Sequence, residues 1–123
     1  MTVTCISPID GLVYAERPTL TLEAARDVVS ATRAAQPAWA ARPLQERIDL
    51  VMAGVAAVGA MNDEIVPELA HMMGRPVRYG GEFGGFNERA SYMADIASEA
   101  LADIQVGEDA TFKRYIKRIP HGV

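Results

Sequence analysis

Apolar residues recur at helical spacing in three long stretches of this chain. The first stripe consists of Leu22, Ala25, Val29, Thr32 and Trp39. Spacings of three, four and seven residues place such positions on one face of a helix. Either Thr19 or Thr21 could cap its start with a side-chain oxygen. Pro37 is expected to end or kink this helix, because proline lacks the amide hydrogen and crowds the preceding turn.

A second helix is expected to open with Pro43, a residue well suited to a first helical position. Its stripe consists of Leu44, Ile48, Val51, Met52, Val55 and Val58. Asn62 could cap a further helical segment that runs to Gly74, where glycine favours a helix end. Pro67 lies inside that segment.

A third helix is expected after the glycine-rich stretch 80–85, which we interpret as a flexible bend between helices. Its stripe consists of Phe86, Ala90, Met93, Ala97, Ala100, Leu101 and Ile104. The stretch 80–85 does not match the Gly-x-Gly-x-x-Gly pattern of dinucleotide sites, because Glu82 occupies a position that requires glycine. No strand is predicted directly before it.

Short β-prone segments lie at both ends of the chain. Residues 4–6 and 12–14 are separated by the turn-forming stretch 8–11, which predicts a small hairpin. Residues 107–109 are polar and lead into a strand at 111–119. The predicted fold is therefore mainly α with short β elements: an N-terminal hairpin, three to four helices and a C-terminal strand.

The composition is that of an ordinary globular protein. Half of the 123 residues are hydrophobic and 23% are charged, which argues against disorder. The single cysteine, Cys5, cannot form an internal disulfide. The N-terminus lacks the pattern of a signal peptide, and no apolar run approaches the roughly 20 residues of a membrane-spanning helix. We therefore expect a cytoplasmic protein without a membrane partner.

The net charge of −4 is unevenly distributed. Residues 1–110 carry 8 basic and 16 acidic side chains, whereas the last thirteen residues carry four basic side chains and no acidic one. An acidic chain is a poor ligand for nucleic acid, because the phosphate backbone must be neutralised by clustered Lys and Arg. We expect the basic strand to lie on an exposed sheet face or to meet an acidic partner surface.

No pattern of residues indicates a catalytic centre. His71 and His121 each lack a second ligand at metal-binding spacing, and no base lies near Cys5 in sequence. The acidic pairs 63–64 and 108–109 fall at a predicted helix start and in a loop. We therefore predict no catalytic, cofactor-binding or metal-ligating residue in this chain.

Five short motifs occur in an order and spacing that resemble one enzyme family. They are Ser7-Pro8-Ile9-Asp10-Gly11, Gln36-Pro37-Ala38-Trp39, Glu46-Arg47, Met73-Gly74-Arg75-Pro76 and Ile116-Lys117-Arg118-Ile119-Pro120-His121-Gly122-Val123. Together they are similar to the N-terminal quarter of an aldehyde dehydrogenase. Within that arrangement, Trp39 is expected to wedge the junction of the first two helices, and Arg47 to form an ion pair with a neighbouring element.

The resemblance implies NAD- or NADP-dependent oxidation of an aldehyde to a carboxylic acid by the full enzyme. The family's catalytic cysteine and glutamate, and its cofactor-binding glycines, correspond to positions beyond Val123, and Cys5 does not take the place of that cysteine. Residues 1–110 would flank the cofactor-binding domain, and residues 111–123 would begin the oligomerisation sheet. The implied partners are the remainder of the enzyme and other subunits.

The chain opens a new apolar segment at Val123, so we expect it to be a piece of a larger protein that is inactive alone. Two alternatives remain open. The chain could be a freestanding helical interaction module related to the same family. It could also be an unrelated small helical protein whose basic strand binds an acidic or nucleic ligand.

Overall fold

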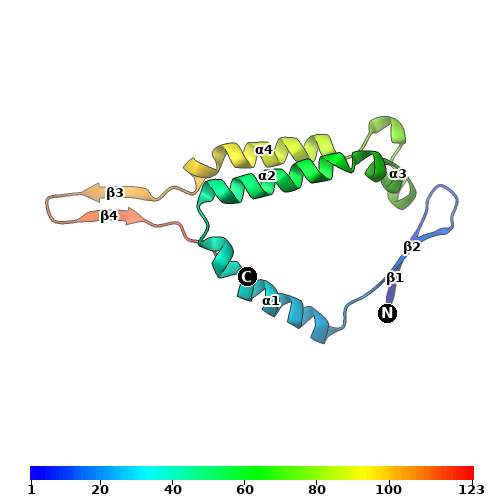
Figure 1. Ribbon diagram of the computed structural model, residues 1–123, viewed down its shortest axis with the longest axis horizontal. Coiled ribbons are helices and arrows are strands. Elements are labelled where there is room, and N and C mark those ends of the chain that lie inside the picture. Colours follow the sequence, from blue (N-terminus) through cyan, green and yellow to red (C-terminus); the bar gives the residue numbers. More distant parts are fainter.

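The computed structural model describes all 123 residues as an open arrangement of helices and hairpins (Figure 1). The helices α2 (Leu44–Ala60) and α4 (Phe83–Ala100) lie side by side at its centre. One hairpin extends from one end of this pair, the other hairpin lies near α3 (Asn62–Met73) beyond the opposite end, and α1 (Leu22–Ala40) runs diagonally away from the pair. The chain exposes 9759 Å², whereas a compact monomer of this mass exposes about 6,500 Å². The fold therefore leaves about half as much area again in contact with solvent.

The N-terminal hairpin is confirmed, with longer strands than predicted. β1 (Thr2–Ile6) pairs antiparallel with β2 (Val13–Pro18), and the register shifts between Cys5 and Ile6. Ser7 is 1% exposed, and its amide donates to the Leu12 carbonyl at 2.8 Å. Gly11 has a φ of +74°, a left-handed conformation that favours glycine in this turn.

Helix α1 (Leu22–Ala40) is capped by Thr21, one of the two predicted candidates, whose hydroxyl accepts a hydrogen bond from the Ala24 amide at 3.1 Å. Pro37 was expected to end or kink this helix, and it does not end it, since the helix continues to Ala40. Near a C-terminus a proline removes only one intrahelical hydrogen bond, and the Ala41 amide still reaches the Pro37 carbonyl at 3.0 Å. No residue of α1 is buried.

Helices α2 (Leu44–Ala60) and α3 (Asn62–Met73) follow each other with a bend at Met61. Pro43 precedes α2 as its N-terminal cap rather than forming its first turn. Pro67 lies within the continuous helix α3. Gly74 ends α3 as predicted, with a φ of +76° and its amide bonded to the Ala70 carbonyl.

The connection from α3 to α4 is a short 3₁₀ turn, η1 (Val77–Tyr79), clasped by Arg75. The Arg75 guanidinium donates to the Gly80 carbonyl at 3.2 Å and pairs with Glu82 at 2.5 Å. Helix α4 (Phe83–Ala100) begins inside the glycine-rich stretch 80–85. Only the first half of that stretch, residues 80–82, therefore forms the bend that was predicted for all of it. The prediction that this helix extends to Ile104 is wrong, because the helix ends at Ala100.

Ile104 instead begins β3 (Ile104–Glu108), a strand that the sequence pattern did not reveal. β3 pairs antiparallel with β4 (Lys113–Ile116), which lies within the predicted strand at 111–119. The two strands form an arm that projects from the helices (Figure 1). A register shift between Gln105 and Gly107 marks a bulge in β3.

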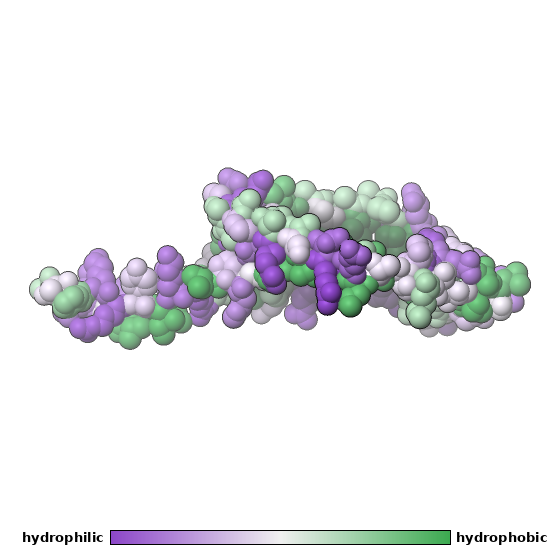
Figure 2. All heavy atoms as spheres, turned by 90° about the horizontal axis from the view of Figure 1, so that it is seen from below, coloured by the Kyte–Doolittle hydropathy of each residue, from purple (hydrophilic) through white to green (hydrophobic).

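The chain has almost no core of its own. Only Val55, Ala70 and Ser7 are buried, and the apolar positions on the predicted helical stripes are largely exposed. A space-filling view shows apolar side chains along the lower side of the arm and scattered over the central body (Figure 2). No single helix has the length and apolar character needed to cross a membrane, although the bent pair α2 and α3 meets both criteria jointly.

Candidate functional site

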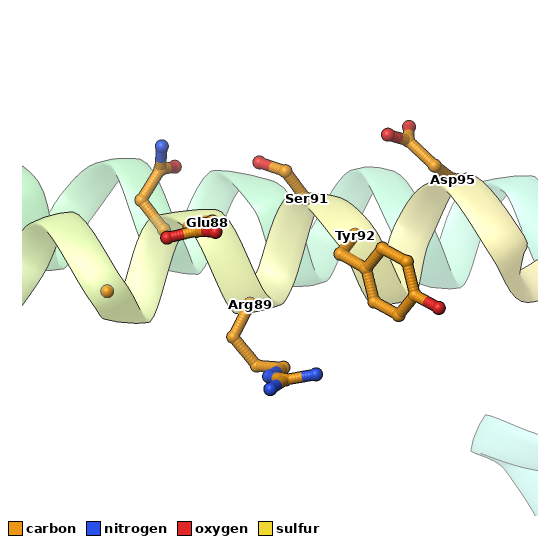
Figure 3. A pocket seen from close by; sticks show the side chains of 7 residues that line it. Glu88, Arg89, Ser91, Tyr92 and Asp95 are labelled. Atoms are coloured by element: carbon orange, nitrogen blue, oxygen red, sulfur yellow. The ribbon is translucent and has the colours of Figure 1, made fainter.

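A concavity of about 620 Å³ lies along a single helix. All of its lining residues belong to α4, among them Glu88, Ser91 and Asp95. Figure 3 shows that their side chains fan outward along the helix instead of converging. Because catalysis requires groups held around one point, this surface is not an active site.

A more specific cluster joins the N-terminal hairpin to α3. The Tyr14 hydroxyl donates to Glu68 Oε1 at 2.8 Å, and the Tyr14 ring stacks on His71 with 4.9 Å between the centroids. Pro8 packs against Gly74, where an added Cβ would lie 3.1 Å from Pro8 Cγ. Two of the five sequence motifs, at 7–11 and 73–76, therefore meet here.

The pKa values of two side chains near this cluster, Asp10 and Tyr14, are shifted by their hydrogen bonds. The Leu12 amide donates to Asp10 Oδ1 at 3.0 Å and lowers the pKa of Asp10 below 3.8. The hydrogen bond to the Glu68 carboxylate raises the pKa of Tyr14 above 10.0, because ionisation would place two negative charges side by side. His71 Nδ1 is shielded from solvent and has no hydrogen-bond partner.

The Tyr14–Glu68 contact has a pH signature. A raised tyrosine pKa contributes stability that is present below pH 10 and is lost as the pH rises through the folded-state pKa. We expect the Glu68→Gln variant to lower the pKa of Tyr14, measured by tyrosinate absorbance at alkaline pH with Tyr14→Phe as the reference. An unchanged titration in Glu68→Gln would show that the contact does not form in solution.

Three further motifs meet at the other end of the helical pair. An open groove of about 240 Å³ lies between α2, α4 and the end of α1. It is lined by seven apolar residues and one arginine: Trp39, Ile48, Val51, Ala90, Met93, Ala94, Ala97 and Arg47. Trp39 lies at the helix junction as expected, although 39% of it remains exposed. We call this hollow the Arg47 groove.

Arg47 also lines a neighbouring hollow of about 310 Å³ formed with the returning C-terminal segment. Leu101, Arg118, Ile119, Pro120 and His121 complete its lining. The ion pair expected for Arg47 is not formed within residues 1–123, and the adjacent Glu46 pairs with Arg42 at 3.8 Å. Arg47 Nε is shielded from solvent and has no hydrogen-bond partner.

Two of the four basic side chains of the C-terminal segment, Lys113 and Arg114, form ion pairs within the arm. Lys113 pairs with Glu108 at 3.0 Å, and Arg114 pairs with Asp109 at 3.3 Å. The Arg118 amide donates to an Asp103 carboxylate oxygen at 3.1 Å. The two residues of each ion pair are five positions apart in sequence, and the turn of the β3–β4 hairpin brings them together. The sequence pattern did not predict β3, so it did not predict these pairs.

No other residue considered in the sequence joins a catalytic arrangement. Cys5 is a half-buried free thiol in β1, and its Sγ contacts the Met72 carbonyl oxygen at 3.7 Å. No group of three or more His, Cys, Asp or Glu side chains converges on a point. The Tyr14–Glu68–His71 cluster was missed, because contacts across 54 residues leave no local signal.

The comparisons with known proteins agree with this arrangement. The model of the aldehyde dehydrogenase family matches residues 1–123, the whole chain. The chain belongs to the aldehyde dehydrogenase family. The resemblance carried by the five motifs is thereby confirmed. No curated protein matches the sequence significantly.

Two solved structures show the same fold. A protein from Burkholderia cenocepacia assigned as an aldehyde dehydrogenase aligns with a TM-score of 0.86 and 24% identity, over 98% of this chain and 25% of its own. PnpE, solved in complex with nicotinamide adenine dinucleotide, aligns with a TM-score of 0.76 and 22% identity, over 94% of this chain and 24% of its own. The chain thus spans about a quarter of the length of each of these two proteins.

Proposed function

We propose that this chain is the N-terminal portion of an NAD- or NADP-dependent aldehyde dehydrogenase, which oxidises an aldehyde to a carboxylic acid. The observation that carries the proposal is the family match over the whole chain. The alignment with one quarter of larger relatives supports it, as does the shortage of buried residues, because a segment of a larger body leaves its apolar faces open.

Residues 1–123 do not fit a dinucleotide. α4 is preceded by the turn η1 rather than by a strand, and Gly84 and Gly85 lie within its first turn. A phosphate-binding loop requires a strand, a glycine-rich turn and then a helix N-terminus. We therefore assign the cofactor and the reacting groups to the remaining part of the enzyme, and a structural and assembly role to this segment.

We propose that residues 1–110 flank the cofactor-binding domain and that the strand within 111–123 enters the oligomerisation sheet, together with β3. A two-stranded hairpin is marginally stable alone in water, and this arm exposes Val106, Phe112 and Ile116 by 57% or more. Pairing with further strands of the enzyme or of another subunit would cover them. The ion pairs within the arm support a partner other than nucleic acid. A cytoplasmic location remains part of the proposal.

The test combines this chain with the remaining three quarters of the Burkholderia relative, by coexpression. We expect NAD- or NADP-linked oxidation across a panel of aldehydes only when both parts are present, followed by absorbance of the reduced cofactor. The Cys5→Ala variant is expected to retain that activity. Turnover by the chain alone that depends on Cys5 would contradict the proposal, and association without turnover would favour an interaction module.

A further inference from the structure

We draw no further inference here: the strongest candidate, the side-chain cluster in which Tyr14 of the N-terminal hairpin meets Glu68 and His71 of α3, carries nothing further, because its side chains do not converge on a metal-binding point and a switching role would rest on the raised pKa of Tyr14 alone.

Discussion

Urea is expected to unfold the isolated 123-residue chain gradually, without a cooperative transition. Cooperativity requires elements that share one core, and here Val55 and Ala70 are the only buried apolar residues. The C-terminal hairpin packs within itself, the N-terminal hairpin contacts α3 mainly through exposed side chains, and α1 has no buried residue that would couple it to α2. Circular dichroism should therefore show a broad loss of helicity.

The same chain is expected to bind a hydrophobic dye strongly, because many large apolar side chains of α2 and the arm are exposed. A sharp transition with a slope of about 1–3 kcal/mol per molar urea, typical of small globular domains, would show instead that the chain builds a core of its own.

Two glycines of α2 are expected to respond in opposite directions to the same substitution. At Gly59 an added Cβ would lie 2.5 Å from Phe83 Cζ, whereas nothing lies within 4 Å of such an atom at Gly54. Alanine at either site gains about 1 kcal/mol of helix propensity. Only Gly59→Ala also forces the Phe83 ring away, and overpacking of this kind costs about 1–3 kcal/mol.

Amide exchange along α2 measures this difference without requiring a cooperative transition. Gly59→Ala is expected to exchange roughly 5- to 150-fold faster than Gly54→Ala, the factors that correspond to about 1–3 kcal/mol. Equal protection in the two variants would show that Phe83 does not hold α4 against α2 in solution.

Local chemistry made several helix ends predictable from the sequence. Thr21 caps α1 because its hydroxyl reaches the Ala24 amide, and Gly74 ends α3 because it adopts a left-handed conformation at a φ of +76°. The turn at 8–11 similarly predicted the N-terminal hairpin. Each of these features depends on a few adjacent residues, which a sequence displays directly.

Features that depend on distant partners were not predictable. Leu101 and Ile104 continue the helical spacing of α4, so the pattern could not reveal that Ile104 pairs with Ile116 in a strand. The apolar stripes indicated which side chains are suited to burial, but they did not indicate which element would bury them. Val29, for example, is 47% exposed. The Arg47 groove combines residues of α1, α2 and α4, and only the fold brings them together.

Scanning calorimetry of the chain, alone and assembled with the remaining three quarters of an aldehyde dehydrogenase, tests most directly whether these helices require a larger body. A self-sufficient domain of 123 residues would absorb about 85 kcal/mol in one transition near 60 °C. We predict no such peak for the chain alone and a single peak that includes it after assembly. A full-sized peak from the chain alone would contradict the account.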